Sequence, residues 1–127
     1  MSGPVLVTGG AGFIGSHIVD RLVNDNIETI ALDNLSTGMI SNLSNNEGKK
    51  NFCFIKEDMC NSEGIRNVLK GIKTVFHMAA DPEVRTVFEN PESTYRENLK
   101  NTFYFLEEIR KSDVEKSKTV EFMAQES

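Results

Sequence analysis

A glycine-rich stretch near the start of the chain reads Gly9-Gly10-Ala11-Gly12-Phe13-Ile14-Gly15. It follows an apolar run at residues 4–8, which predicts a strand buried on both faces of a sheet. Apolar residues recur at helical spacing over residues 13–23, which predicts a helix with one face on that sheet. Glycines allow a tight turn and a close approach of pyrophosphate to the backbone, and the N–H groups of a helix N-terminus bind anions. This order of elements predicts a dinucleotide-binding turn; a turn needed only for packing is the alternative.

An acidic residue follows the second predicted strand, residues 29–32. Asp33 lies about 20 residues beyond the glycine motif, where dinucleotide-binding folds place a carboxylate. That carboxylate accepts hydrogen bonds from the adenosine ribose and repels a 2′-phosphate, so the pattern favours NAD over NADP. A role limited to capping the following turn is the alternative for Asp33. Asp58 follows the third strand, residues 52–55, where it is equally suited to accept from the adenine amino group or to cap a helix.

Strands and helices continue to alternate along the chain. Residues 34–50 are polar and predict an irregular loop, whereas Asn61 or Ser62 is placed to cap a helix that Gly71 ends. Residues 74–78 predict the fourth strand. The alternation predicts an α/β fold, a doubly wound parallel sheet of the Rossmann type with about four to five strands, in one domain over residues 1–127.

The longest helix is predicted from Pro91 to about Lys111. Its apolar stripe, which we expect to lie in the core, consists of Leu99, Phe103, Leu106 and Ile109. The polar end of the fourth strand, His77, is expected to be a hydrogen-bonded core residue and not a catalytic one. Residues 119–124 are the segment expected to form a fifth strand.

Composition limits the classes of function. Hydrophobic residues make up 39% and charged residues 26% of the chain, as in folded globular proteins. The net charge of −5 argues against binding nucleic acid or an anionic membrane through a broad basic surface. Cys53 and Cys60 form no Cys-x-x-Cys pair, so we expect no metal site, no disulfide framework and a cytoplasmic location. No apolar run approaches the ~18 residues that span a bilayer, so we expect no membrane segment.

Several ordered motifs together resemble the extended short-chain dehydrogenase/reductase family, in particular its NAD-dependent nucleotide-sugar epimerases and dehydratases and, within these, the UDP-glucose 4-epimerase branch. The resemblance covers roughly residues 4–115. It rests on residues 8–17, on Asp33-Asn34-Leu35-Ser36-Thr37-Gly38, on Asp58-Met59, on His77-Met78-Ala79-Ala80, and on Asn98 with Asn101-Thr102.

The resemblance implies a set of NAD contacts. Backbone groups at Gly9, Gly12, Phe13, Ile14 and Gly15 would hold the pyrophosphate. The adenosine ribose would be surrounded by Asp33, Asn34, Leu35, Ser36, Thr37 and Gly38, and adenine would be bordered by Asp58 and Met59. The nicotinamide half would be approached by Met78, Ala79 and Ala80, with Asn98 steadying that region. For the two alanines, tight packing alone is the alternative.

The catalytic pattern of that family is missing from this chain. The family's epimerases use a Tyr-x-x-x-Lys pair, in which lysine lowers the pKa of the tyrosine that removes a hydroxyl proton. Here Tyr95 has Leu99 four residues on, and Tyr104 has Glu108. We therefore expect no catalytic residue in this chain, a tail that departs from the family after about residue 115, no substrate domain and no turnover by the chain alone.

The resemblance also implies a function and partners for the longer protein. The expected function is the NAD-binding part of a UDP-glucose/UDP-galactose 4-epimerase, which transiently oxidises sugar C4. A nucleotide-sugar 4,6-dehydratase fragment and a non-catalytic NAD-binding module are the alternatives. The expected partners are a nucleotide-sugar substrate and a second copy in a homodimer.

Overall fold

The computed structural model describes residues 3–79, 91–112, 114 and 116–119, with only the backbone at 93–95, 97–98 and 116–119. The strands are β1 (Val5–Thr8), β2 (Thr29–Asp33), β3 (Phe52–Lys56), β4 (Thr74–His77) and β5 (Lys116–Thr119). The helices are α1 (Phe13–Asn24), the 3₁₀ helix η1 (Ile40–Asn46), α2 (Ser62–Leu69) and α4 (Pro91–Arg110).

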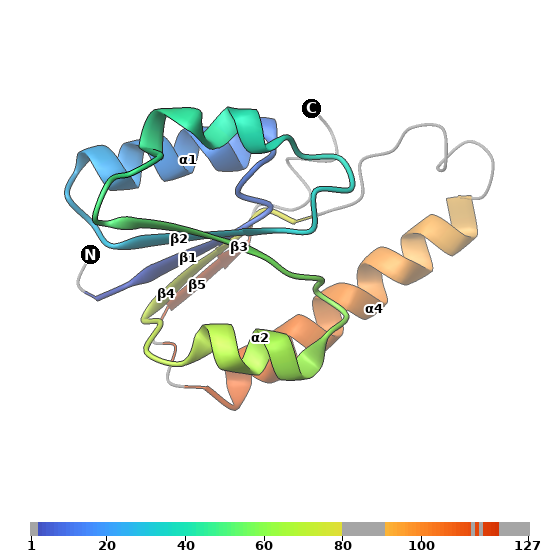
Figure 1. The fold of residues 1–127 in the computed structure, drawn as a ribbon. Helices are drawn as coiled ribbons and strands as arrows, with labels where there is room; N and C mark the ends of the chain where they lie inside the picture. The colour runs from blue at the N-terminus through green and yellow to red at the C-terminus, as the bar shows by residue number, and fades with distance from the viewer. Residues whose placement is uncertain (1–2, 80–90, 113, 115, 120–127) are drawn as a thin grey trace.

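The strands form one parallel sheet in the order β3-β2-β1-β4-β5. Figure 1 shows α1 and η1 on one face of the sheet and α2 and α4 on the other, which confirms the predicted doubly wound architecture. The chain moves outward from β1 to β3 and then returns to place β4 on the other side of β1. Ligands of such sheets bind outside the carboxyl ends of the strands, where the strand order reverses. In this chain that position lies beyond Thr8 and His77.

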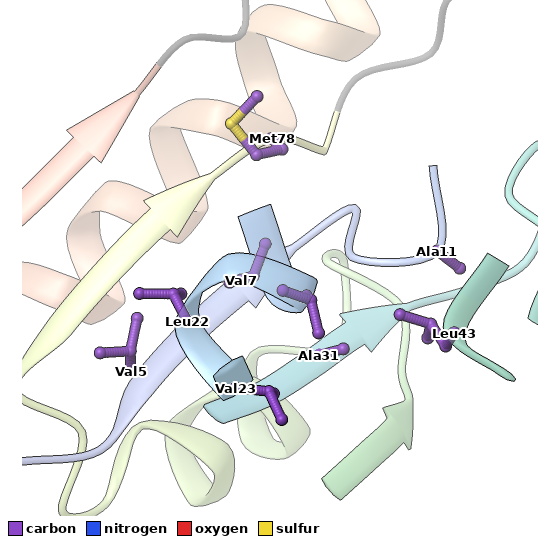
Figure 2. Close-up of a cluster of buried hydrophobic side chains, with 9 residues drawn as sticks. Val5, Val7, Ala11, Leu22, Val23, Ala31, Leu43 and Met78 are labelled. Carbon is purple, nitrogen blue, oxygen red and sulfur yellow. The ribbon is translucent and has the colours of Figure 1, made fainter. Parts of the chain in front are cut away.

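The central strand β1 supplies both halves of the core, because all four of its residues are buried. Val5 and Val7 face α1 in a cluster that also contains Leu22 and Leu43 (Figure 2). Leu6 belongs to the opposite cluster, which packs under α2 and α4. A strand covered on both faces needs apolar residues at every position, which is why residues 4–8 read as a continuous apolar run.

The polar segment between β2 and β3 is not wholly irregular, contrary to our prediction. It contains η1, which packs on α1 through Leu43, 3% exposed. Asn46, 1% exposed, donates from Nδ2 to the carboxylate of Asp20 at 2.6 Å. One buried leucine among asparagines and serines gives too weak a periodicity to mark a helix, so the sequence pattern missed it.

Contrary to our prediction, three of the four residues in the apolar stripe of α4 lie outside the core. Leu99, Phe103 and Leu106 are 57%, 58% and 44% exposed. Phe105, 1% exposed, is the residue of α4 that packs under the sheet, with the half-buried Ile109 beside it. The helix has apolar side chains on two faces, and helical spacing alone does not tell which face meets the sheet.

The fifth strand begins earlier than predicted. β5 starts at Lys116, which pairs with Thr74 of β4, and residues 120–124 of the predicted strand lie outside the described residues. The sequence of β5, Lys-Ser-Lys-Thr, is polar. The prediction failed because it was based on an apolar run, whereas this strand is recognised by its backbone pairing with β4.

Candidate functional site

Two glycines of the turn after β1 are required by packing. Gly9 has a φ of +64°, and a Cβ there would lie 2.8 Å from the backbone nitrogen of Ala79. A Cβ on Gly15 would overlap the carbonyl oxygen of Gly9. Residues 9–12, which we call the phosphate loop, therefore press closely on the end of β4 and on the first turn of α1.

Gly12 is less tightly constrained than these two glycines. Its φ of −77° suits any residue. A Cβ built there would lie 3.2 Å from the carbonyl oxygen of Gly9, a close contact that needs that carbonyl to shift by a few tenths of an ångström. Glycine at this position also allows a bound group to approach the backbone closely.

Among the residues that the structure describes, no side chain caps the N-terminus of α1. Its N-cap, Gly12, provides no side-chain hydrogen bond, and the first turn contains no acidic residue. The helical ladder begins with Ser16 N, which donates to Gly12 O at 3.0 Å. The N–H groups of Phe13, Ile14 and Gly15 precede that bond, and helix geometry gives them no intrahelical acceptor. They form the positive end of the helix dipole, which attracts an anion.

The carboxylate of Asp33 is fixed beside this turn, at the end of β2. Asp33 is 8% exposed. Its Oδ2 accepts from Ala11 N at 3.0 Å, and its Oδ1 accepts from Leu35 N at 2.9 Å. Each carboxylate oxygen has a second lone pair, so both keep the capacity to accept from a ligand hydroxyl. Asp33 makes the turn bond that was the alternative for it, and it also reaches the phosphate loop.

Residues 34–39, which we call the ribose loop, wrap around the Asp33 carboxylate. Leu35 adopts a φ of +63°, an uncommon conformation for a residue with a branched side chain. Asn34 Oδ1 accepts from Ser36 N at 2.9 Å. A Cβ on Gly38 would lie 2.8 Å from Asp33 Oδ2, so glycine lets the loop pass close to the carboxylate. The predicted residues 33–38 are thus brought together, with Ser36 and Thr37 exposed.

Asp58 and Met59 lie beyond the end of β3, on the neighbouring part of the same edge. Asp58 is exposed, and its Oδ1 accepts from Cys60 N at 2.9 Å. The cap of α2 is Asn61, whose Oδ1 accepts from Gly64 N at 3.2 Å. Capping of α2, the alternative for Asp58, is therefore carried out by Asn61, one of the two residues, Asn61 and Ser62, that the sequence offered for this cap. Met59 is half-buried against the core under α2.

The end of β4 is joined to β1 by a buried hydrogen-bond network. Thr8 Oγ1 accepts from Met78 N at 3.0 Å and from Ala79 N at 3.2 Å. Its hydroxyl hydrogen is then directed to His77 Nδ1, 2.7 Å away, which assigns the proton of the imidazole to Nε2. His77 stacks on Phe105 at a centroid distance of 4.6 Å, and burial lowers its pKa to about 4. The prediction that His77 is a hydrogen-bonded core residue is confirmed.

Other predicted site residues are described in part or not at all. Ala80 lies outside the described residues, and of Asn98 only the backbone, within α4, is described. The sequence analysis missed Ala11 and Asn42. The backbone of Ala11 binds Asp33, and its carbonyl oxygen accepts from Asn42 Nδ2 at 2.8 Å. Peptide-group contacts leave no signal in the residue types, so no pattern pointed to Ala11.

The described residues also bear on two other features, metal sites and membrane-spanning helices. In these residues no group of three or more His, Cys, Asp or Glu side chains is arranged to hold a metal ion. No helix in the described part of the chain is long and apolar enough to cross a membrane.

Comparisons with known proteins agree with this geometry. The fold and the turn after β1 define a Rossmann-type protein of the extended short-chain dehydrogenase/reductase class. The family described as GDP-mannose 4,6 dehydratase matches residues 6–125. The chain belongs to this family of nucleotide-sugar epimerases and dehydratases.

The similar proteins include both epimerases and dehydratases. UDP-glucose 4-epimerase of Mycolicibacterium smegmatis is 36% identical over 113 residues, which are 87% of this chain and 36% of that protein. The dTDP-glucose 4,6-dehydratase of Escherichia coli is 32% identical over 111 residues, 84% of this chain and 31% of that protein. The solved complex of Thermus thermophilus UDP-glucose 4-epimerase with NAD is 38% identical, with a TM-score of 0.76, over 90% of this chain and 36% of that one. The chain thus spans about a third of the length of its relatives.

Proposed function

We propose that this chain is the NAD-binding part of a nucleotide-sugar 4-epimerase. The observation that carries the proposal is the position of Asp33 beside the phosphate loop, with both carboxylate oxygens held by backbone N–H groups at 2.9 and 3.0 Å. A carboxylate fixed in this way beside an open helix N-terminus matches two neighbouring groups of an adenosine diphosphate, the ribose diol and the pyrophosphate. The structure of the similar Thermus thermophilus epimerase is a complex with NAD.

The described residues fit this cofactor. The N–H groups of Phe13 and Ile14 would donate to the pyrophosphate, and Gly12 would allow its close approach. Asp33 would accept from the ribose hydroxyls, with residues 34–38 around it. Asp58 and Met59 would border adenine, whereas Met78 and Ala79 would approach the nicotinamide half.

The chemistry of the longer protein would depend on the cofactor that this chain binds. When bound, NAD supplies the hydride acceptor for a transient oxidation at C4 of a nucleotide sugar. The residues of this chain would bind and orient the cofactor, and a base elsewhere must take the hydroxyl proton. The printed sequence contains no Tyr-x-x-x-Lys, because the residues four positions after Tyr95 and Tyr104 are Leu99 and Glu108. We therefore expect this chain alone to convert no UDP-glucose to UDP-galactose with NAD present.

The partners of the longer protein would be a nucleotide sugar and a second copy of itself, in the cytoplasm. The exposed side chains of Leu99, Phe103 and Leu106 on α4 would form the contact between copies. Replacing Phe103 with Glu should shift the sedimentation of the chain from dimer toward monomer. A wild-type chain that sediments as a monomer at all concentrations would contradict the homodimer.

A 4,6-dehydratase is the second candidate, because the matching family is described as GDP-mannose 4,6 dehydratase and the Escherichia coli relative is 32% identical. Both enzymes would use the same cofactor half, so assays of the longer protein with UDP-glucose and dTDP-glucose would separate them by product. A non-catalytic NAD-binding module is the third candidate. It would be favoured if a longer protein carrying this sequence turned over neither sugar.

Titration calorimetry with NAD and NADP tests the proposal directly. NAD should bind more tightly than NADP by at least ~10-fold, because the Asp33 carboxylate opposes the 2′-phosphate. Asp33→Asn keeps the side-chain shape but removes the negative charge, so it should reduce the preference for NAD over NADP. Saturating NAD should also raise the Tm of the chain, since a ligand selective for the folded state stabilises it. Equal binding of the two cofactors would contradict the role of Asp33, and the absence of NAD binding would contradict the proposal.

A further inference from the structure

The ribose loop is fastened to the phosphate loop at a single residue, Ala11. Ala11 N donates to Oδ2 of Asp33 at 3.0 Å, and Asp33 is the last residue of β2, directly before the ribose loop. Ala11 O accepts from Met39 N at 3.1 Å, at the end of that loop, and from Asn42 Nδ2 at 2.8 Å. The residue before the ribose loop and the last residue of the loop are therefore both hydrogen-bonded to the backbone of Ala11. The side chain of Ala11 is fully buried.

Asn42 is the partner of Ala11 O that acts through its side chain, so a substitution can remove it without restricting the backbone. The other partner, Met39 N, is a backbone group that every residue except proline provides. Asn42 lies on η1 with its side chain exposed, so it contributes nothing to the core. The buried residues Leu43 and Asn46 hold η1 against α1 independently of it. Loss of the Asn42 side chain should leave the fold intact and loosen the link between the two loops.

The link bears on the choice of cofactor. The backbone of Asp33 is fixed in β2, so its carboxylate rejects a 2′-phosphate most strongly when its oxygens are held in one orientation and the ribose loop cannot move aside to make room for the phosphate. Asp33 is held by N–H groups from both loops, Ala11 on one side and Leu35 on the other. The hydrogen bond from Asn42 Nδ2 to Ala11 O holds the phosphate loop to the segment that directly follows the ribose loop.

We propose that Asn42 is a positioning residue that sets the preference of this chain for NAD over NADP, by locking the ribose loop onto the carbonyl oxygen of Ala11. The proposal rests on the proposed NAD-binding function. It assigns to Asn42 no contact with the cofactor. Its effect passes through the ribose loop to Asp33.

Two substitutions of Asn42 test the lock, and the same helix provides matched controls. Asn42→Ala removes the donor, whereas Asn42→Asp also places a carboxylate oxygen against the carbonyl oxygen of Ala11. Asn45 is the same residue type, exposed three positions further along η1. Asn45→Ala and Asn45→Asp therefore reproduce the loss of the amide and the added charge without touching Ala11.

Calorimetry should give the dissociation constants of all five proteins for NAD and NADP. The NADP-to-NAD ratio of these constants should fall about fivefold in Asn42→Ala, as expected for loss of one hydrogen bond, and further in Asn42→Asp. The Asn45 variants should keep the wild-type ratio. Equal weakening of both cofactors in the Asn42 variants, or the same ratio in the Asn42 and Asn45 variants, would overturn the proposal.

Amide hydrogen exchange without ligand separates the lock from the cofactor. The amides of Leu35 and Met39 should exchange faster in Asn42→Asp than in wild type. In Asn45→Asp they should exchange at the wild-type rate. Unchanged exchange in Asn42→Asp would overturn the lock itself. Faster exchange in a protein that binds neither NAD nor NADP would keep the lock but overturn both its role in cofactor choice and the proposed function.

Discussion

Two helices begin at the same edge of the sheet, and their first turns are built differently. In α2, the Asn61 side chain accepts from Gly64 N at 3.2 Å, and Glu63 places a negative charge in the first turn. Glu57 supports this cap, since its Oε1 accepts from Asn61 Nδ2 at 3.1 Å. In α1, the N-cap Gly12 has no side chain to offer, and the first turn contains no acid.

The difference separates a structural helix terminus from a binding one. The first N–H groups of any helix need acceptors, and the positive end of its dipole favours a negative charge. In α2, side chains of the helix itself and its cap provide an acceptor for Gly64 N and a negative charge. In α1, the described residues provide neither, and the helix begins beside Asp33, whose carboxylate is suited to a ribose. We conclude that the open terminus of α1 is the anion-binding end of the candidate site. Four predictions test this comparison.

The largest effect is expected from Gly12→Val. A branched side chain at the open terminus would stand where the pyrophosphate approaches, so NAD affinity should fall by about a thousandfold, equivalent to about 4 kcal/mol. The fold should survive with a modest loss of stability, because the φ of Gly12 is −77°, which valine can adopt, and the 3.2 Å contact of its Cβ with the Gly9 carbonyl oxygen needs only a small shift. Asn61→Val is the matched control at the terminus of α2 and should leave NAD affinity unchanged. Calorimetry with circular dichroism measures both properties, and a folded Gly12→Val protein with wild-type affinity would contradict the comparison.

Acid should lower the stability of the buried network around His77, at the end of β4. Burial holds the pKa of His77 at about 4, below its ordinary value of 6.5, so the unfolded chain binds this proton first as the pH falls. The free energy of unfolding should be independent of His77 above pH 6.5 and should fall by about 3 kcal/mol between pH 6.5 and pH 4.

Urea unfolding across this pH range measures the loss. His77→Asn should remove most of this pH dependence, whereas the same change at the exposed His17 should keep it. A His77→Asn protein with the wild-type pH dependence would show that another group is responsible.

A third effect compares the same helical position in the two helices. Gly15 and Gly64 are each the third residue of their helix. A Cβ on Gly15 would overlap the backbone carbonyl of Gly9, so Gly15→Ala should lower the free energy of unfolding by about 2 kcal/mol. A Cβ on Gly64 would meet only side-chain atoms, the end of Glu57 and, at 2.8 Å, Nδ2 of the cap residue Asn61, and these can turn away. Gly64→Ala should therefore lower stability by at most about 1 kcal/mol, the value of the cap, and losses equal to those of Gly15→Ala in denaturant melts would contradict the difference.

The smallest effect is expected from Asn61→Ala. Removal of this cap should cost about 1 kcal/mol of stability, the usual effect of losing an N-cap side chain. NAD affinity should stay at the wild-type value, because the terminus of α2 binds no external anion in this account. A loss of NAD affinity in a protein that melts normally would show that the two termini are not functionally distinct.

The sequence predicted the parts of the fold that depend on buried, regular elements. The first four strands were located to within one residue, because strands covered on both faces are continuous apolar runs, as residues 4–8 show. The cap of α2 was predicted because Asn61 acts through its own side chain. The position of Asp33 followed from its spacing after the glycine motif.

The rest depends on features that residue types do not encode. η1 has a single buried leucine, Leu43, and its polar neighbours hid it. The face of α4 that meets the sheet is decided by Phe105, and the sequence offered a second apolar face with equal periodicity. The contacts of Ala11 are made by its peptide groups, so neither this residue nor Asn42 was predicted.

Nitrogen–proton NMR of the chain titrated with NAD tests the open terminus most directly. The account predicts that the amide signals of Phe13, Ile14 and Gly15 shift strongly and saturably, together with that of Leu35 beside Asp33. The amides of Gly64 and Ile65 in the first turn of α2 should remain unchanged. Shifts at α2 equal to those at α1, or no shifts at Phe13 to Gly15 at saturating NAD, would contradict the claim that α1, and not α2, keeps its N-terminus open for the cofactor.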